Sequence, residues 1–175
     1  MLRLSYFLPF VWMYFSVQIL SAQNVPYAQK PSVKTGNYYS WNLVFNPDFE
    51  MNINEWSSLN NSTVSVTNTL PFSEMYSLKI TDRNSPFAGV KQDISSVITK
   101  KGNGVYWLGA AFRLETGSDM VILEFISGNN TVSFSRFIDT AWNYVYGLDT
   151  INFNNSDVSL RIYTKNSTTN LYVDE

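Results

Sequence analysis

Val-Tyr-Trp-Leu-Gly-Ala-Ala-Phe-Arg-Leu, at residues 105–114, places an apolar residue at every second position. A period of two is typical of a β-strand that turns one face toward a hydrophobic core. The predicted core face consists of the even-numbered residues Tyr106, Leu108, Ala110, Phe112 and Leu114. On the other face, Gly109 and Ala111 follow Trp107 and leave room above the sheet, for a shallow cleft or for a closely packed loop.

The same alternation recurs along the chain. Residues 63–67 and 158–162 alternate cleanly, and Val121, Leu123 and Phe125 share one face. Further strands are expected at 41–46, 75–81, 88–94, 104–115, 131–138, 142–153 and 169–174. Clusters of Gly, Asn, Ser and Pro separate these segments. The pattern predicts an all-β chain with about ten short antiparallel strands in a two-sheet β-sandwich.

Residues 1–22 have the pattern of a secretory signal peptide. Arg3 supplies the positive start, residues 4–20 are mostly apolar, and Ser21-Ala22 offers small residues for cleavage. The alternative is a membrane anchor, but the apolar run is interrupted by a proline and a glutamine and is shorter than the about 20 residues of a spanning helix. We therefore expect a secreted, extracellular protein with no membrane segment after cleavage.

The remainder of the chain divides into an arm and a folded module. Residues 23–39 are polar and contain two prolines and a glycine, which predicts a linker or loose N-terminal arm. Residues 40–175 carry the strand pattern. A mature chain of about 150 residues can bury roughly two-thirds of its unfolded surface, which suits one domain.

Composition excludes several classes of function. Without Arg3 the chain has 11 basic and 14 acidic residues, a net charge of −3, so no basic face for nucleic acid is expected. It contains no His and no Cys, which excludes Ser-His-Asp and Cys-His nucleophilic sites and the common imidazole or thiolate metal sites. Any metal must be held by oxygen atoms, which favours calcium.

Five N-glycosylation sequons are present, and each needs a surface position in a secreted protein. Their acceptor residues are Asn60, Asn61, Asn129, Asn154 and Asn166. We expect some of them to carry glycan if the source is eukaryotic.

Five stretches, in the same order, resemble the carbohydrate-binding modules of families 4, 9 and 22. They are Asn-Leu-Val-Phe-Asn-Pro-Asp-Phe-Glu at 42–50 followed by Trp56, Tyr-Ser-Leu-Lys-Ile-Thr-Asp-Arg at 76–83, Ala-Gly-Val-Lys-Gln-Asp-Ile at 88–94, Trp142 with Gly147 five residues on, and Leu-Tyr-Val-Asp at 171–174. The resemblance covers residues 42–174, and the stretch from Arg83 to Gln92 is most similar to the xylan-binding family 22.

The resemblance implies a jelly-roll sandwich that binds a glycan on a concave sheet face and holds a structural calcium ion near the chain ends. By position, Glu50 and Asp174 would be the side-chain ligands of this ion. Calcium takes six to eight oxygen ligands, including carboxylates. The alternative is that Glu50 caps a turn and Asp174 is solvated.

Sugar binding requires aromatic platforms, because the apolar C–H faces of pyranose rings lie on aromatic rings while their hydroxyls pair with polar groups. Phe87 stands where the family has a Trp, four residues after Arg83, and is either a platform or a plug at a sheet edge. Trp107 is a second platform candidate, or it packs under a loop. Tyr163 matches a binding Tyr of the family and lies on the polar face of its strand beside Arg161.

Three polar residues complete the candidate sugar site, and two tryptophans are assigned elsewhere. Arg83, Gln92 and Glu124 are candidates for hydroxyl binding, although Gln92 also suits a role in satisfying a neighbouring loop. Trp56 and Trp142 are predicted to lie in the core, since large aromatic residues dominate cores.

Three departures from the family pattern bear on the ligand. Phe87 replaces the Trp, Leu59-Asn60-Asn61 replaces a loop that usually carries an Arg, and Lys165 replaces a carboxylate two residues after Tyr163. The sugar could therefore be xylan, another β-glycan, or none.

The sequence thus predicts a secreted, non-catalytic module that binds a polysaccharide. One alternative is a structural extracellular-matrix protein, in a wall or a mineralised matrix, that has lost specific binding. Another is a fragment of a glycoside hydrolase with a catalytic domain on the same chain, because the family's last strand continues beyond the position of Glu175. No acid and base pair for glycoside hydrolysis stands out among the 14 carboxylates.

Overall fold

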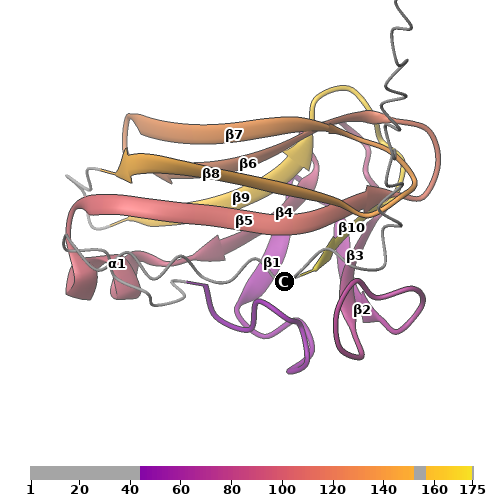
Figure 1. The fold of residues 1–175 in the computed structure, drawn as a ribbon, viewed down its shortest axis with the longest axis horizontal. Helices are drawn as coiled ribbons and strands as arrows, with labels where there is room; N and C mark the ends of the chain where they lie inside the picture. Colours follow the sequence, from indigo (N-terminus) through magenta and orange to yellow (C-terminus); the bar gives the residue numbers. More distant parts are fainter. Residues whose placement is uncertain (1–43, 152–156, 175) are drawn as a thin grey trace, which may run out of the picture. The chain divides into compact units, whose positions relative to one another are not determined.

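The structure is a computed structural model that describes residues 44–151 and 157–174 (Figure 1). These residues form ten strands and one short helix. In chain order the elements are β1 (Trp56–Leu59), β2 (Thr63–Thr67), β3 (Ser77–Thr81), β4 (Gly89–Asp93), α1 (Ser95–Lys101), β5 (Gly104–Leu114), β6 (Asp119–Ser127), β7 (Asn130–Ile138), β8 (Asn143–Ile151), β9 (Val158–Thr164) and β10 (Leu171–Asp174). The predicted leader and arm, residues 1–39, lie outside the described residues.

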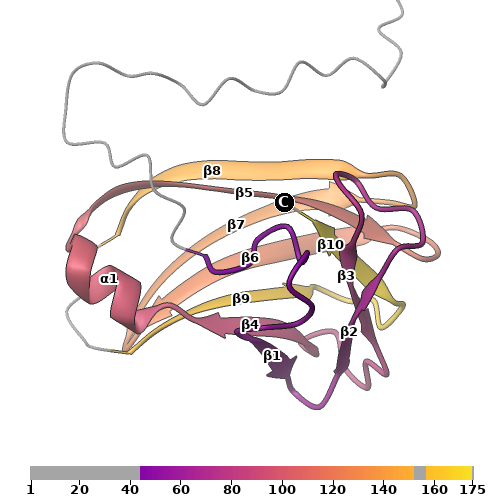
Figure 2. The ribbon, with the colours of Figure 1, turned by 90° about the horizontal axis from the view of Figure 1, so that it is seen from below.

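The strands form two five-stranded sheets that stack on one another as two layers (Figures 1 and 2). The first sheet has the order β1-β4-β9-β6-β7, and the second has the order β2-β3-β10-β5-β8. Every paired strand is antiparallel to its neighbour. The predicted β-sandwich jelly roll is therefore confirmed. The solvent-facing sides of the two sheets are called the first face and the second face below.

The core lies between the sheets and is built from the alternating positions of the longest strands. All five even-numbered residues of β5 from Tyr106 to Leu114 are buried. Val121, Leu123 and Phe125 of β6 and Val158, Leu160 and Ile162 of β9 are buried in the same cluster. The period of two thus identified the inward side of β5, β6 and β9 correctly, because burial of that side drives the pairing of the two layers.

One edge of the sandwich is closed by a close approach of β7 to β8. The Cα of Gly147 in β8 faces the ring of Phe134 in β7, and a β-carbon at this position would overlap that ring. The glycine of the family-like Trp142–Gly147 pattern is therefore required by packing.

The structure differs from the sequence analysis in three local elements. Residues 44–46 of the predicted strand 41–46 are bends, and the rest of that segment lies outside the described residues. Strand β1 and helix α1 were not predicted. The described residues contain no helix long and apolar enough to span a membrane.

The two tryptophans assigned to the core have different surroundings. Trp56 is buried, packs on Phe49 with ring centroids 5.4 Å apart, and donates from Nε1 to the Asn46 carbonyl at 3.1 Å. Trp142 is half-buried and contacts Phe72 and Arg113 on the second face, so its predicted place in the core is wrong.

Candidate functional site

The first face carries an aromatic pair. Phe87, in the loop before β4, has 56% of its surface exposed. Its ring centroid lies 5.8 Å from that of Tyr163 in β9, with the two planes inclined at 56°. Tyr163 lies on the solvent side of its strand because its neighbours Ile162 and Thr164 are buried. Two predicted site residues are thus side by side, and Phe87 is not a buried plug.

The loop that carries Phe87 is fixed from below by Arg83, which is only 5% exposed. The Arg83 guanidinium donates to the carbonyls of Ala88 at 2.8 Å, Pro86 at 2.9 Å and Thr169 at 2.6 Å. Burial lowers the pKa of Arg83 to about 10, and the Asp119 carboxylate opposes this shift. The predicted contact of Arg83 with sugar is therefore wrong, because its donors are used in the interior to position the Phe87 loop.

Two further hydrogen bonds hold this loop from the sides. Asn60 Nδ2 donates to the Phe87 carbonyl at 2.9 Å, and the Thr164 N–H donates to the Pro86 carbonyl at 3.3 Å. The backbone of the loop is therefore bonded to three separate segments of the chain, through Arg83, Asn60 and Thr164. A platform held this way loses little conformational freedom when a ligand binds.

Gln92 in β4 is fully buried and has no access to a ligand. Its Oε1 accepts from the Phe45 N–H and its Nε2 donates to the Phe45 carbonyl, both at 2.8 Å. The predicted role of Gln92 in sugar binding is wrong, and its alternative role, satisfaction of a neighbouring loop, is what the structure has.

A row of charged side chains crosses the first face next to the aromatic pair. Arg161 of β9 stands opposite Lys91 of β4 on one side and opposite Glu124 of β6 on the other. Burial, followed by the Glu124 carboxylate, raises the pKa of Tyr163 above its ordinary value, while Arg161 acts in the opposite direction. The Tyr163 phenol is therefore neutral at physiological pH and can both donate and accept a hydrogen bond.

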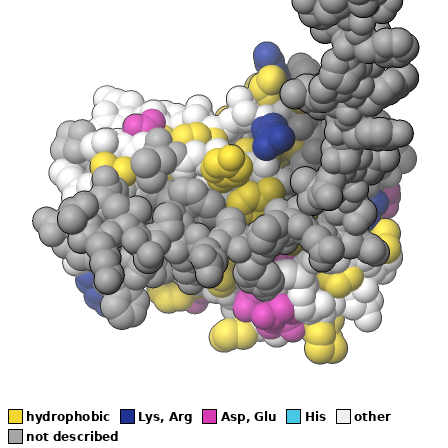
Figure 3. Space-filling view, viewed as in Figure 1, with side chains coloured by type: hydrophobic (Ala, Val, Ile, Leu, Met, Phe, Trp, Pro, Cys, Tyr) yellow, Lys and Arg dark blue, Asp and Glu magenta, His cyan; other side chains and the backbone are white. Residues whose placement is uncertain are grey.

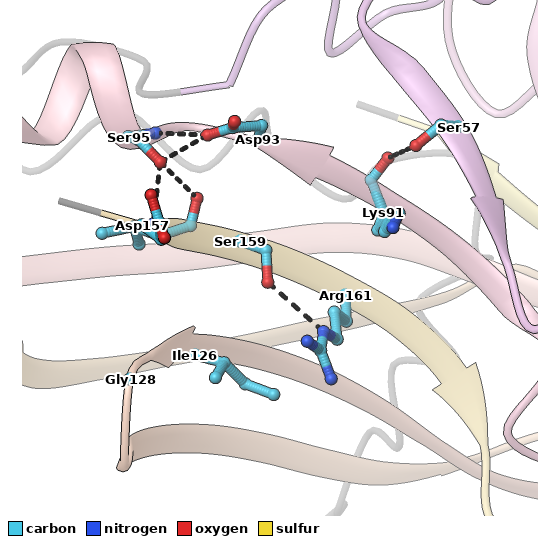
Figure 4. Close-up of a pocket in the computed structure, with 10 residues that line it drawn as sticks. Ser57, Lys91, Asp93, Ser95, Ile126, Gly128, Asp157, Ser159 and Arg161 are labelled. Carbon is cyan, nitrogen blue, oxygen red and sulfur yellow. Dashed lines mark hydrogen bonds between the residues drawn. The ribbon is translucent and has the colours of Figure 1, made fainter. Parts of the chain in front are cut away.

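A polar hollow of about 360 Å³ continues the first face beyond Arg161 (Figure 4). It is lined by three serines, four charged side chains and a few apolar groups: Ser57, Ser95, Ser159, Lys91, Asp93, Asp157, Arg161, Ile126, Gly128 and Val158. Arg161 projects across it and Ser159 accepts from its Nε at 3.3 Å. Hydroxyls and charges from four elements thus converge next to the aromatic platform, although Phe87 and Tyr163 themselves do not line the hollow.

Trp107 does not belong to this face. Its backbone pairs with Leu148 in the second sheet, and its side chain lies outside the described residues. The three aromatic candidates Phe87, Trp107 and Tyr163 therefore do not share one sheet face, as a single sugar site on a concave face would require. Alternation assigns a side chain to the inside or the outside of a sandwich, but it does not say which of the two sheets the strand joins.

Both predicted calcium ligands are bound to one loop, residues 72–76. Asp174 is buried and accepts from the N–H groups of Phe72 at 2.7 Å and Ser73 at 3.1 Å, so the alternative that it is solvated is wrong. Glu50 Oε1 accepts from the N–H groups of Met75 and Tyr76, each at 2.9 Å. No group of three or more acidic residues gathers within the described ranges. The two carboxylates are hard oxygen donors that fit calcium, with backbone oxygens needed to complete the shell.

Four of the five sequon residues are described, and all four are exposed. They are Asn60, Asn61, Asn129 and Asn166, whereas Asn154 lies outside the described residues. The Nδ2 atom that would carry a glycan already donates to a protein acceptor in Asn60 and in Asn166, the latter to Asp119 at 3.1 Å. That some of these five positions carry glycan remains a prediction.

A jelly-roll sandwich with a fixed aromatic pair beside a hydroxyl- and charge-lined hollow offers the groups that a sugar-binding site needs. The chain belongs to the carbohydrate binding domain family CBM_4_9, whose profile matches residues 41–169. No curated protein matches the chain.

Solved structures of similar fold include several family 22 modules. The C-terminal family 22 module of Clostridium thermocellum Xyn10B has a TM-score of 0.65 at 16% identity, over 74% of this chain and 88% of that one. The CBM22-1 xylan-binding domain of Paenibacillus barcinonensis Xyn10C has a TM-score of 0.60 at 17% identity, over 69% and 81%. A family 16 carbohydrate binding module has a TM-score of 0.53 at 20% identity, over 77% and 96%. At these identities the likeness establishes the fold alone.

Proposed function

We propose that this protein binds a neutral polysaccharide, xylan or another β-glycan, along the first face and does not cleave it. The observation that carries the proposal is the exposed Phe87 ring, set 5.8 Å from Tyr163 on a loop that the buried Arg83 holds in place. Two of the similar structures are described as xylan-binding domains, which favours xylan as the first ligand to test.

The chemistry of binding follows from this arrangement. A pyranose ring would place its C–H face on Phe87 or Tyr163, which removes apolar surface of both partners from water. Its hydroxyls would pair with the Tyr163 phenol, Arg161 and Glu124, and those of the next sugar would reach the hollow. Because the polar groups are few and fixed, they orient the chain while the rings supply most of the affinity.

Retention of the protein on insoluble xylan, β-glucan and chitin tests the proposal. Phe87→Ala should weaken retention on the preferred polysaccharide about tenfold, equivalent to about 1.4 kcal/mol, with no change in the melting temperature. Met51→Ala, which removes an equally exposed apolar side chain from the 46–52 turn, is the matched control and should bind normally. Failure of the unmodified protein to bind any of the three would instead favour the structural-matrix alternative.

The same proposal covers the setting of the module. We propose that the leader 1–22 directs secretion and that binding serves to hold an attached activity on its polysaccharide. One similar structure, from Clostridium thermocellum Xyn10B, combines a CBM22-1 module with a GH10 module and was solved with xylohexaose. A transcript that extends past Glu175 into a catalytic domain would support this setting, and a stop codon directly after Glu175 would refute it.

We also propose that calcium reinforces the 72–76 loop through Glu50 and Asp174. Each carboxylate would keep its bonds to loop N–H groups and offer its remaining lone pairs to the ion. Binding to the folded state alone would raise the melting temperature, so a chelator should lower it. Glu50→Gln should abolish the calcium-dependent part of that shift. A melting temperature that is the same with calcium and with chelator would rule the site out.

A further inference from the structure

The first face carries a further exposed ring, that of Phe137 in β7. This side chain is 63% exposed, more than Phe87 at 56%. Phe137 points to solvent because the next residue, Ile138, is fully buried and successive side chains of a strand alternate between its two sides. Burial of apolar surface is what stabilises a fold, so a ring this exposed contributes little to folding.

The register of the first sheet relates Phe137 to the aromatic pair. Tyr163 in β9 stands opposite Ile122 in β6, and Ile122 stands opposite Ser135 in β7. Phe137 is two residues further along β7 and two strands away from Tyr163, so their Cα atoms lie about 12 Å apart. This separation exceeds the length of one pyranose ring and therefore suits two different sugars of one chain.

The surface between these rings is an aliphatic strip, formed by Met120 and Ile122 on the outer side of β6. Both side chains are half-buried, and each stands beside one of the aromatic groups: Met120 opposite Phe137, and Ile122 opposite Tyr163. Ser135, which is exposed, adds a hydroxyl at the edge of the strip. An apolar floor between aromatic rings, with a few polar groups beside it, is what a bound sugar chain requires.

The polar hollow lies on the opposite side of the aromatic pair from Phe137. Lys165, two residues after Tyr163, donates its N–H to the Met120 carbonyl at 2.9 Å and so stands level with Phe137. Arg161, two residues before Tyr163, projects across the hollow. The hollow is also lined from β1 and β4, which lie on the side of β9 away from β7. Phe137, the aromatic pair and the hollow therefore follow one another along a diagonal of the first face.

Exposed rings also occur on the second face, so exposure alone does not define this line. Figure 3 shows hydrophobic side chains gathered over β5 and β8. Tyr146 of β8 is 62% exposed, nearly the same as Phe137. Because Tyr146 belongs to the other sheet, it does not contact a chain bound across the first face. Phe137 differs from Tyr146 in its continuity with the aromatic pair.

We propose that one polysaccharide chain lies diagonally across the first face with Phe137 as its second aromatic platform, a placement that rests on the proposed function. Successive sugars lie on Phe137, on the aliphatic strip and on the aromatic pair, and the chain continues into the hollow. The site therefore recognises several consecutive sugars. A disaccharide occupies only part of the line, so longer oligosaccharides bind more tightly.

The dependence of affinity on chain length tests this placement. Calorimetric titration of the whole protein uses the disaccharide and the hexasaccharide of xylan, β-glucan and chitin. We expect the hexasaccharide of the preferred sugar to bind more tightly than its disaccharide. Phe137→Ala should weaken hexasaccharide binding about tenfold and change disaccharide binding by less than about twofold, because the aromatic pair remains intact. Phe137→Trp keeps a platform and should bind the hexasaccharide normally.

Tyr146→Ala is the matched control, because it removes a ring of equal exposure from the second face and should leave hexasaccharide binding unchanged. Normal hexasaccharide binding by Phe137→Ala, together with weakened binding by Phe87→Ala, would overturn the placement of the chain and leave the proposed function standing. Absence of binding by the unmodified protein to all of these oligosaccharides would overturn both. A dimer that Phe137→Ala dissociates would also overturn the placement, because the ring would then be a contact between copies of this chain.

Discussion

The two outer faces of the sandwich obtain their aromatic rings in different ways. On the first face, Phe87 comes from a loop whose shape depends on the buried cation Arg83. On the second face, Tyr144 and Tyr146 are alternate residues of one strand, and the register of β8 alone places them. The first face is therefore sensitive to changes in the interior beneath it, whereas the second is sensitive to changes in strand position. Substitutions in the interior and in β8 can separate these two dependences.

Replacing the cation under the first face should have the largest effect. Arg83→Met leaves the carbonyls of Pro86, Ala88 and Thr169 without their donor in a buried setting. Because buried acceptors without partners are costly, we expect the free energy of unfolding to fall by about 3 kcal/mol or more, measured by urea denaturation. Binding at Phe87 should weaken beyond what the loss of stability explains.

Lys91→Met is the control for this substitution, because Lys91 is an exposed cation on the first face. It should change the unfolding free energy by less than about 0.5 kcal/mol. If the two variants were equally stable, Arg83 would not be the support of the Phe87 loop, and the contrast between the faces would disappear.

Moving β8 should affect the second face instead. In Gly147→Ala the new methyl group meets the Phe134 ring, so one strand must shift, and we expect a loss of about 2 kcal/mol in thermal or urea unfolding. Gly104→Ala is the matched control at the start of β5, where the added carbon would lie 3.7 Å from the Tyr106 ring, an ordinary contact. Adding Phe134→Leu should restore part of the loss, and a double mutant no better than Gly147→Ala would refute the packing explanation.

The sequence predicted which side of β5, β6 and β9 is buried, since burial acts on every second residue. It did not predict β1, because Trp56–Leu59 contains two serines and only four residues. It also missed α1, which has no acidic residue in its first turn and no side-chain cap. Both elements follow from tertiary contacts that local signals do not encode.

The candidate site was predicted less well, for a related reason. Phe87 and Tyr163 were found because one follows a turn and the other lies on a polar strand face. Arg83 and Gln92 have polar side chains, which are expected at the surface from the sequence alone. In the structure they are buried and bond to carbonyls 86 and 47 residues away. Trp107 was grouped with Phe87 and Tyr163 although its strand belongs to the other sheet, because strand alternation contains no information on sheet membership.

The support of the first face should also depend on pH, through Asp119. Burial raises the pKa of Asp119, but the N–H groups of Asn166 and Ser167 outweigh it, so the pKa lies below its ordinary value. A depressed carboxylate pKa stabilises the fold above the unfolded-state pKa of about 4, and this contribution is lost as the pH falls through the folded-state pKa. Asp119→Asn should cost about 1–2 kcal/mol at pH 7 and should lose less stability than the unmodified protein between pH 6 and pH 3. Parallel pH profiles for the two proteins would show that Asp119 does not contribute in this way.

The smallest expected effect concerns a single hydrogen bond to the platform loop. Asn60 donates to the Phe87 carbonyl and has a φ of 54°, a conformation that glycine adopts without strain. Asn60→Gly therefore removes the bond and keeps the turn, so the melting temperature should change little while binding on the first face weakens about threefold, equivalent to about 0.7 kcal/mol. Asn61→Gly, at the next residue with a φ of 61°, is the control, and both should be measured in unglycosylated protein because each substitution removes a sequon. Equal binding by the two variants would show that Arg83 alone is sufficient to hold Phe87, whereas a selective loss in Asn60→Gly would show that the first face depends on its loop contacts at the surface as well as in the interior.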